Sequence, residues 1–342
     1  MRFAIIGAGI IAAVHARLIA SLGDKATLVA VVDSDPERAE RLAQLYGAAA
    51  YGDAASAYAA QDVDAVAVCV PSALHADVAI EALRAGKDVL IEKPVAVTLE
   101  ATDRIMEAEK ASGRTVTVIS QRRFQPSAAF IKRSIDEGRL GRVTSGIAES
   151  VLFRSQAYYD SGEWRGTVEI DGGGALMNQG IHALDLLIWM LGVPVQVSAH
   201  TSRVAHERIE VEDVAAATIL FKNGAIGLIL ASTAANPGLP VRLEVHGDQG
   251  VAVMEKERLS FFESVLVDNP AEIGLPLPEE TLRDGWSVLD NAHRAQYEDF
   301  INAVGEHRTP GVSTHAGRRV LAVVLALYRS ARIGRPVDLE GV

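Results

Sequence analysis

A doubly wound parallel α/β domain, followed by an α+β domain with an open, mostly antiparallel sheet, is the fold that this sequence predicts. Short apolar runs alternate with helical segments through about the first third of the chain, and a glycine-rich turn follows the first of these runs. Much of the second half consists of alternating runs typical of strands. A chain of 342 residues also exceeds what one hydrophobic core usually organises. We therefore expect two domains, residues 1–121 and residues 122–342.

The composition excludes several classes of function. A net charge of -11 with no basic run argues against nucleic-acid binding, which depends on clustered Lys and Arg. The longest apolar run, Val320–Tyr328, is less than half of the roughly 20 residues that span a bilayer, so no membrane partner is expected. The chain starts directly in a strand without a secretion signal, and its single cysteine, Cys69, lies in a buried strand. A cytoplasmic protein is expected.

The glycine-rich turn is the first element that indicates a ligand. Gly7–Ala12 has the pattern G-x-G-x-x-A, between a strand at Arg2–Ile6 and a helix at Ala13–Leu22. Glycines at such a turn permit a tight bend and the close approach of a pyrophosphate to the helix N-terminus, where backbone amides favour an anion. The turn predicts a Rossmann dinucleotide-binding domain.

Asp33 supports this interpretation. It ends the second predicted strand, Thr27–Val32, and lies 21 residues after Ala12, where a dinucleotide fold places the acid that binds the adenosine ribose. Because a carboxylate there repels a 2'-phosphate, NAD is favoured over NADP. Ser34 follows the acid, although Arg38 could still contact the cofactor. The alternative is that Asp33 caps the following helix.

Two later strand ends carry polar side chains. The strand Ala65–Val70 leads into Pro71, Ser72 and His75, and the strand Asp88–Ile91 leads into Glu92-Lys93-Pro94. Ligands of parallel α/β sheets bind beyond the carboxyl ends of the strands, so these residues are expected near the nicotinamide. Partial burial lowers the pKa of an ammonium, which suits Lys93 as a base or as a donor to a hydroxyl. The alternative is a structural ion pair with Glu92. The helices expected here are Ala73–Ala85 and Thr98–Ser112, and the last strand is Thr115–Ser120.

The chemistry is expected in the stretch Gly172–Asp185. Three glycines precede a largely apolar helix, Ala175–Leu191, that should be buried. Asn178, His182 and Asp185 are spaced i, i+4 and i+7, which places them on one face of an α-helix. A polar stripe on a buried helix must face partners or a wet cavity. The alternative is a core histidine bonded to Asp185.

Together, the glycine turn, Asp33, Val70-Pro71-Ser72 with His75, Glu92-Lys93-Pro94 and the glycine-rich helix with His182 resemble the glucose-fructose oxidoreductase and inositol dehydrogenase family, Gfo/Idh/MocA. The resemblance covers essentially the whole chain. It implies an NAD-dependent dehydrogenase that acts on a sugar, a sugar derivative or a cyclitol. One departure is Asn178, where many inositol dehydrogenase-like members have aspartate, so a proton relay through this position is in doubt.

The resemblance also implies residue roles. His182 is expected to accept the proton of a substrate hydroxyl while Lys93 stabilises the developing alkoxide, with the reverse assignment as competitor, and Asp185 could orient the imidazole. The predicted catalytic residues are Lys93, His182 and Asn178. The predicted cofactor contacts are Gly7, Gly9, Ile10, Ile11, Asp33, Ser34, Arg38, Val70, Pro71, Ser72, His75, Glu92, Lys93, Gln121, Trp164 and Arg165. The predicted substrate contacts are Lys93, Arg122, Tyr159, Arg165, Asn178 and His182. Neighbouring residues on a strand point to opposite sides, so Arg122 and Arg123 cannot both face the cleft, and the resemblance implies that Arg122 is the substrate contact.

The rest of the second domain is predicted to form the open sheet. Its expected strands are Arg142–Phe153, Val195–Arg203, Val214–Phe221, Ala225–Ser232, Val241–His246, Val251–Glu255 and Leu259–Phe262, and its expected helices are Ser127–Glu137, Asn291–Val304 and Thr314–Ile333. Asn223-Gly224 is a hairpin signal. The apolar residues on the second face of this sheet predict pairing with another copy, and the resemblance implies a homodimer or homotetramer. His293 starts the helix Asn291–Val304 and could reach the site, but a capping or surface role is expected instead.

Two other classes of function are alternatives to the dehydrogenase. A glycosidase that uses NAD transiently, as some relatives do, would accumulate no NADH, and a non-catalytic NAD-dependent sensor would not need Lys93 and His182. Metal catalysis is not expected, because no paired spacing of His and carboxylate ligands appears. The cleft carries few cations, so a neutral sugar or cyclitol is favoured over a phosphorylated substrate.

Overall fold

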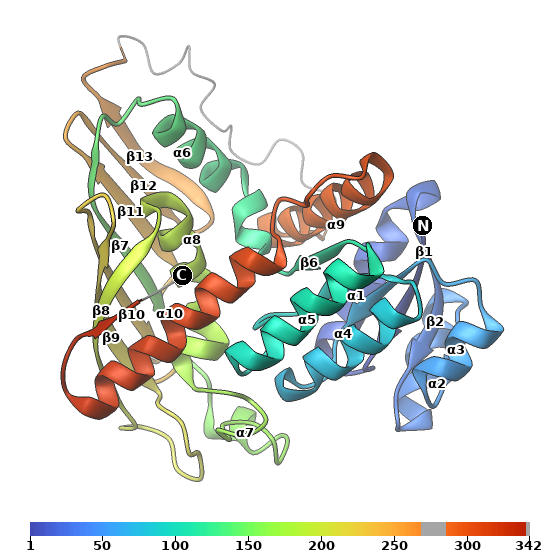
Figure 1. Cartoon of the computed structure of the whole chain (residues 1–342). Coiled ribbons are helices and arrows are strands. Elements are labelled where there is room, and N and C mark those ends of the chain that lie inside the picture. Colours follow the sequence, from blue (N-terminus) through green and yellow to red (C-terminus); the bar gives the residue numbers. More distant parts are fainter. Residues whose placement is uncertain (268–284, 340–342) are drawn as a thin grey trace. The chain divides into compact units, whose positions relative to one another are not determined.

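The computed structural model describes residues 1–267 and 285–339 and divides into two compact units (Figure 1). The first comprises Met1–Ser120 and His293–Arg318, and the second comprises Gln121–Ala292 and Arg319–Val342. The first break lies beside the predicted boundary at residue 121. The predicted second domain includes everything beyond it, whereas residues 293–318 belong to the first unit. Tyr297 and Phe300 explain why residues 293–318 belong to the first unit, because their rings lie 5.5 and 6.3 Å from that of Phe3 on the first strand.

The first unit is the predicted doubly wound domain. Its elements are β1 (Arg2–Ile6), α1 (Ile10–Ser21), η1 (Gly23–Lys25), β2 (Thr27–Val32), α2 (Pro36–Tyr46), β3 (Ala49–Tyr51), α3 (Ala54–Ala60), β4 (Ala65–Val68), η2 (Ser72–Leu74), α4 (His75–Arg84), β5 (Asp88–Ile91), α5 (Leu99–Ser112) and β6 (Val116–Val118). Six parallel strands follow the order β3-β2-β1-β4-β5-β6. The order reverses between β1 and β4, which is where such sheets bind ligands. The short β3 and α3 were not predicted.

The interior of this sheet explains its unbroken apolar runs. Every residue of β4 and β5 is buried, and so are four of the five residues of β1. Parallel strands are covered on both faces by their crossover helices, so they read as continuous rather than alternating hydrophobic runs. Helices α4 and α5 lie side by side against the sheet (Figure 1).

The second unit is the predicted α+β unit. Its elements are η3 (Gln121–Phe124), α6 (Pro126–Asp136), β7 (Val143–Val151), α7 (Gln156–Tyr159), η4 (Ala175–Gly180), α8 (Ile181–Leu191), β8 (Pro194–Ser202), β9 (Val214–Phe221), β10 (Ile226–Ser232), β11 (Arg242–Gly247), β12 (Gly250–Glu255), β13 (Arg258–Ser264) and β14 (Val337–Asp338). The last helices, α9 (Val288–Glu306) and α10 (Thr314–Ile333), have residues in both units. Among the described helices, none is long and apolar enough to cross a bilayer.

Eight strands form the sheet of this unit, in the order β13-β12-β11-β7-β10-β9-β8-β14. Neighbours are antiparallel except β7 and β10. The predicted hairpin at Asn223-Gly224 joins β9 to β10. Helix α8 packs against β7, β10 and β11 (Figure 1). Leu220, Ile226 and Leu228 are 40%, 50% and 42% exposed, so the sheet presents apolar side chains that the unit itself does not cover.

Candidate active site

The glycine turn between β1 and α1 leaves room for a ligand. Gly7 has φ +94°, and a Cβ there would lie 2.7 Å from the carbonyl oxygen of Cys69, so glycine is required. A Cβ on Gly9 would meet no described atom within 4 Å. Ile10, at the start of α1, is 80% exposed, and Ile11 is exposed as well. The open turn and the backbone amides of α1 fit a pyrophosphate.

Asp33 is fixed beside this turn. Its Oδ2 accepts a hydrogen bond of 2.7 Å from the N–H of Ala8, and its Oδ1 accepts one of 2.9 Å from the N–H of Asp35. The N-cap of α2 is Asp35, which accepts from the N–H groups of Glu37 and Arg38. The alternative role of Asp33 as the helix cap is therefore wrong. Its carboxylate is held where the ribose hydroxyls of a dinucleotide are expected.

Two predicted cofactor contacts that closely follow Asp33 lie on the surface of the first unit. Ser34 and Arg38 are both exposed. The Nε of Arg38 lies 3.0 Å from Asp35 Oδ2 in an exposed ion pair. Such a pair is worth little in water, so Arg38 remains able to move.

His75 lies between two strand ends. Its side chain is buried, with Nδ1 2.7 Å from the carbonyl oxygen of Pro94 and Nε2 3.0 Å from that of Val70. Burial lowers the pKa of His75 and outweighs the two carbonyl groups. A neutral imidazole has one N–H and donates to only one of the two oxygens at a time, so the ring lies between the Val70-Pro71-Ser72 turn and the segment that carries Lys93 and bonds to one of them. Contact of His75 with the cofactor stays a prediction.

Glu92 is turned into the interior of the first unit. Its Oε1 lies 2.9 Å from Nε2 of His15, and its Oε2 accepts a hydrogen bond of 3.0 Å from the backbone N–H of Lys93. Burial alone would raise the pKa of this carboxyl, but the hydrogen bond and charge of His15 lower it far below its usual range. Glu92 is thus an ionised anchor for the backbone of Lys93, whose side chain is half-buried.

A cluster of rings surrounds this anchor. Nδ1 of His15 lies 2.6 Å from the hydroxyl of Tyr297, and the ring of His293 meets that of His15 edge-on at 5.0 Å. The expected capping or surface role of His293 is wrong, because its side chain is buried. In the described part of the chain, His15, Glu92 and His293 have ligand atoms within 4.8 Å of one another. Both ring nitrogens of His15 have hydrogen-bond partners, Tyr297 and Glu92.

The glycine-rich stretch of the second unit begins a helix, as predicted, but its first turn is a π-helix, Ala175–Gly180. Gly174 must be glycine, because a Cβ there would overlap the carbonyl oxygen of Glu212. The carboxylate of Glu212 accepts hydrogen bonds from the N–H groups of Gly174 and Leu176 at 3.0 and 2.8 Å. Burial raises the pKa of Glu212. The hydrogen bonds from these N–H groups and from the Tyr328 hydroxyl act in the opposite direction, but burial outweighs them. The start of the helix is therefore held by buried groups.

The three residues of the predicted polar stripe do not share one environment. Asn178 and His182 are half-buried, whereas Asp185 is buried. The carboxylate of Asp185 accepts two hydrogen bonds from Arg123, of 2.8 Å from Nε and 2.5 Å from Nη2. The expected role of Asp185 in orienting His182 is replaced by this buried ion pair, and so is the alternative of a core histidine bonded to Asp185.

Gln121, Arg122 and Arg123 lie on the 3-10 helix η3 and not on a strand. The strand alternation that excluded a cleft position for both arginines therefore does not apply. Nη1 of Arg122 lies 3.4 Å from Oε1 of Glu257, and only 12% of the Arg122 side chain is exposed. Both arginines have acidic partners within the second unit.

The aromatic segment before the glycines gives different positions to its two tyrosines. Tyr159 packs with Ile209 and Val211, and its hydroxyl lies 2.8 Å from Oγ1 of Thr233. Burial raises the pKa of this hydroxyl. Tyr159 is thus a core residue, and the predicted substrate contact is not supported by its position.

Tyr158 takes the more accessible position. Its hydroxyl accepts a hydrogen bond of 2.9 Å from Nη1 of Arg165, whose guanidinium also lies 4.4 Å from the ring of Trp164. The guanidinium of Arg154 lies on the Tyr158 ring as well, at 5.3 Å. Cations over aromatic rings are stabilised by the ring quadrupole. Trp164 and Arg165 are thereby tied to Tyr158.

Three residues near Asn178 were not predicted as part of the site. The amide Nδ2 of Asn178 donates to Oδ1 of buried Asp171 at 2.9 Å, while its Oδ1 accepts from Gln179, which in turn accepts from Arg154. One signal was available. Asp171 directly precedes the three glycines, and an acid beside a glycine-rich turn is a candidate site residue. Arg154 and Gln179 gave none, because only the fold brings them together.

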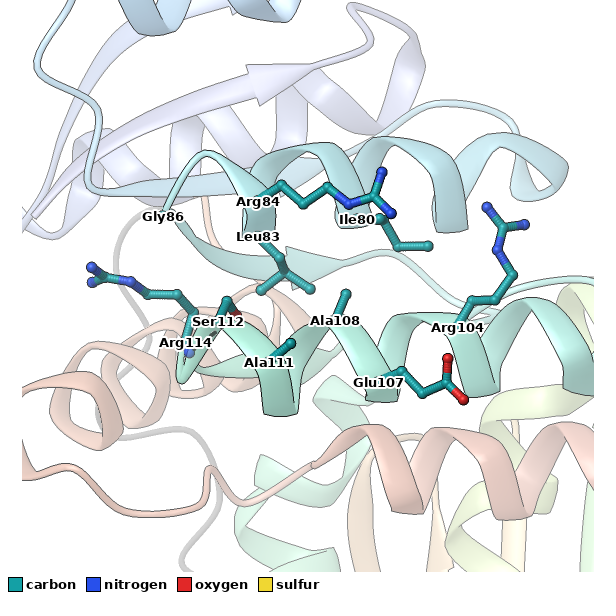
Figure 2. A pocket seen from close by; sticks show the side chains of 10 residues that line it. All are labelled: Ile80, Leu83, Arg84, Gly86, Arg104, Glu107, Ala108, Ala111, Ser112 and Arg114. Atoms are coloured by element: carbon teal, nitrogen blue, oxygen red, sulfur yellow. Dashed lines mark hydrogen bonds between the residues drawn. The ribbon is translucent and has the colours of Figure 1, made fainter.

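A groove of about 520 Å³ lies between α4 and α5 (Figure 2). Apolar side chains such as Leu83 and Ala108 lie between the two helices, with arginines at the edges. Arg104 pairs with Asp77 at 2.7 Å, and Arg114 lies 3.9 Å from Asp88. Its lining contains no predicted site residue, so this groove is a helix packing feature and not the candidate active site.

A dinucleotide-binding unit with an anchored lysine, joined to an α+β unit with polar groups at the start of a buried helix, is the architecture of a nicotinamide-dependent oxidoreductase. Residues 1–120 match the Gfo/Idh/MocA oxidoreductase family, with its NAD-binding Rossmann fold, and residues 129–253 match the Gfo/Idh/MocA C-terminal domain. The chain belongs to the Gfo/Idh/MocA family. The predicted resemblance and NAD as the cofactor are confirmed.

Known relatives are similar over their whole lengths. Inositol 2-dehydrogenase of Rhizobium meliloti is 30% identical over 345 residues, with 99% of each chain covered. D-glucoside 3-dehydrogenase of Escherichia coli K12 is 30% identical over 358 residues, covering 99% of this chain and 97% of the relative. The crystal structure of the WlbA dehydrogenase from Bordetella pertussis, in complex with NADH and UDP-GlcNAcA, has 31% identity and a TM-score of 0.87, covering 99% and 98%. Each of these relatives is a dehydrogenase.

Proposed function

We propose that the protein oxidises a secondary alcohol of a sugar, sugar derivative or cyclitol with NAD, or catalyses the reverse reduction. The observation that carries this proposal is Lys93, a half-buried lysine whose backbone is anchored by ionised Glu92 at the carboxyl end of the NAD-binding sheet. The two relatives named for their substrates, inositol and a D-glucoside, support the substrate class. Bound NAD supplies the hydride acceptor.

Lys93 and His182 are proposed to act on one substrate hydroxyl. His182 accepts the hydroxyl proton, and the ammonium of Lys93 donates a hydrogen bond to the oxygen as negative charge develops there. The carbon loses a hydride and the oxygen a proton, so the alcohol becomes a ketone. In the reverse assignment, neutral Lys93 accepts the proton and His182 donates the hydrogen bond. Asn178, four residues before His182, holds the substrate by its amide.

The test is the pair of variants Lys93→Met and His182→Ala. Each should lower kcat by about 10²- to 10⁴-fold, because each removes a group that assists proton transfer, while the Kd for NADH changes little. Residues that act on one hydroxyl behave as a unit, so the double variant should lose much less than the product of the single losses. Independent, multiplicative losses, or near-normal turnover in either variant, would contradict the proposal.

The substrate is proposed to be a neutral sugar or cyclitol. Arg122 and Arg123 both have acidic partners, which supports this choice because neither is an unbalanced positive charge for a phosphate. Wild-type protein with NAD should produce NADH with inositols or glucosides and much less with a phosphorylated sugar or a UDP-sugar acid. Turnover of a glycoside without NADH would instead indicate transient oxidation, and NAD binding without any turnover would indicate a sensor.

The exposed face of the large sheet is proposed to pair with a second copy of the chain. Leu220, Ile226 and Leu228 lie on adjacent strands, and Leu220 is opposite Ile226 in the register of β9 and β10. Apolar side chains that gather on one sheet face favour a self-complementary interface. A homodimer or homotetramer is the expected state.

A further inference from the structure

Four side chains of the second unit form a directed chain of hydrogen bonds. Arg154 Nη2 donates to Gln179 Oε1 at 3.1 Å, Gln179 Nε2 donates to Asn178 Oδ1 at 3.1 Å, and Asn178 Nδ2 donates to Asp171 Oδ1 at 2.9 Å. The other oxygen of Asp171 accepts from the backbone N–H of Gly166 at 2.9 Å. The chain therefore runs from a guanidinium to a buried carboxylate through two amides.

The two ends fix the direction of the chain. A guanidinium only donates hydrogen bonds, and an ionised carboxylate only accepts them. The amides of Gln179 and Asn178 can each be turned around in isolation, but between Arg154 and Asp171 only one orientation of each satisfies all the bonds. The nitrogen of Asn178 must then face Asp171, and its oxygen must face Gln179. This orientation follows from charge and not from the side-chain amides themselves.

The chain of hydrogen bonds also connects two segments that carry predicted site residues. Asn178 lies on the π-helix four residues before His182. Gly166 follows Trp164 and Arg165, which are tied to Tyr158. Asp171, 4% exposed, bonds to both segments at once. Its carboxylate therefore sets the position of the aromatic loop relative to the start of the helix.

We propose that Asp171 is a positioning residue of the active site, which with Arg154 holds the Asn178 amide in one orientation and holds the Trp164-Arg165 loop beside it. This inference rests on the proposed function, since it assigns Asn178 to the substrate. Asp171 acts through Asn178 and the loop and does not touch the reacting atoms. It also places a carboxylate one hydrogen bond away from Asn178, a residue that cannot carry charge itself.

Asp171→Asn tests the direction of the chain. If the new amide at position 171 accepts from Gly166 through its oxygen, its nitrogen faces the nitrogen of Asn178. Turning Asn178 around moves the mismatch to Gln179, and turning Gln179 around moves it to Arg154. The single variant cannot satisfy every bond. We expect kcat to fall about 10- to 100-fold on the inositol or glucoside that wild type oxidises best, with a nearly unchanged Kd for NADH.

The double variant Asp171→Asn with Asn178→Asp restores every donor and acceptor. The amide now at position 171 donates to the carboxylate now at position 178, Gln179 still donates to residue 178, and Gly166 still donates to residue 171. We expect the melting temperature to recover and kcat to exceed that of Asp171→Asn, without reaching the wild-type value because the substrate-facing amide of Asn178 is lost. Recovery of kcat relative to Asp171→Asn, and not of the melting temperature alone, is the readout that separates a positioning role of Asp171 from a purely structural one.

Asn178→Asp alone completes the test. Two carboxylates would face each other across a distance of about one hydrogen bond, so they should share a proton, and the loss of melting temperature relative to wild type should shrink toward acid pH. Asp160→Asn is the matched control, because Asp160 is exposed on the same loop and bonds to Gln156 and Arg208. It should leave kcat and the pH profile unchanged.

Two failures are distinguishable. Wild-type protein that oxidises a sugar or cyclitol, with Asp171→Asn equally active or the double variant no better than Asp171→Asn, overturns the inference and leaves the proposed function intact. Wild-type protein that oxidises no alcohol overturns the proposed function. In that case the melting temperatures still test the chain of hydrogen bonds. Recovery of the melting temperature in the double variant supports the proposed direction of the hydrogen bonds, and additive losses in the two single variants contradict it.

Discussion

Nε2 of His15 and Oε1 of Glu92 meet at 2.9 Å inside the first unit, and the same carboxylate holds the backbone N–H of Lys93. Burial opposes charge on His15, but Cys69, Tyr297 and Glu92 raise its pKa well above the ordinary value of 6.5. The pKa of Glu92 is lowered from 4.5. The raised pKa of His15 and the lowered pKa of Glu92 favour a charged pair beside the backbone of the candidate catalytic lysine, and the ring of His293 lies edge-on to that of His15.

This pair predicts how stability depends on pH. The raised pKa of His15 stabilises the fold fully below pH 6.5, and this contribution is lost as the pH rises toward the folded-state value. The lowered pKa of Glu92 stabilises the fold above pH 4.5 and is lost as the pH falls. The combined contribution should therefore be greatest between pH 4.5 and 6.5.

The measurement is urea unfolding of wild type and His15→Gln between about pH 5.5 and 8.5. The advantage of wild type in free energy of unfolding should shrink above pH 6.5, by about 1.4 kcal/mol per pH unit at most. His200→Gln is the control, because His200 is exposed on β8. A difference between wild type and His15→Gln that stays constant with pH would show that His15 is neutral in the folded protein.

Asp33 predicts the choice of cofactor. Asp33→Ala should raise the Kd for NAD about 10- to 100-fold, because a hydrogen bond to a charged group contributes about 1.5 to 3 kcal/mol. The Kd for NADP should change less, since the 2'-phosphate no longer meets a carboxylate. Titration calorimetry with both cofactors gives the ratio. Asp35→Ala, which removes the cap of α2, should cost about 1 kcal/mol of stability and leave this ratio alone. An unchanged ratio in Asp33→Ala would exclude the ribose role.

The sequence predicted the architecture because its signals are local. The boundaries of β1, β2, β5, β9 and α10 agree with the predicted ranges, since apolar periodicity and glycine punctuation decide these elements. The side chains of the site were harder to place. His293, predicted at the surface, is buried against His15, which lies near the start of the chain. Asp185 was expected beside His182, but Arg123 takes its carboxylate. Spacing along one helix cannot reveal a partner from a distant segment.

Leu228 tests the proposed pairing of the large sheet. Leu228→Glu would place a charge on the exposed apolar face. The proposed homotetramer should then dissociate to dimers or monomers, and a homodimer to monomers. Light scattering coupled to gel filtration measures the mass. Leu45→Glu is the matched control, because Leu45 is 74% exposed on α2 of the first unit. The same mass for wild type and Leu228→Glu would place any interface elsewhere.

The buried pair of Arg123 and Asp185 offers the last prediction. Removing one partner leaves a buried charge alone, so Asp185→Asn should cost about 3 to 5 kcal/mol of stability. Replacing both, as Arg123→Met with Asp185→Leu, should recover most of that loss because no charge is then buried. Urea unfolding measures both. The pH dependence of kcat should be unaltered in the double variant, since Asp185 is bonded to Arg123 and is not assigned to His182. A pH profile that shifts in this variant would instead return Asp185 to the role of orienting His182.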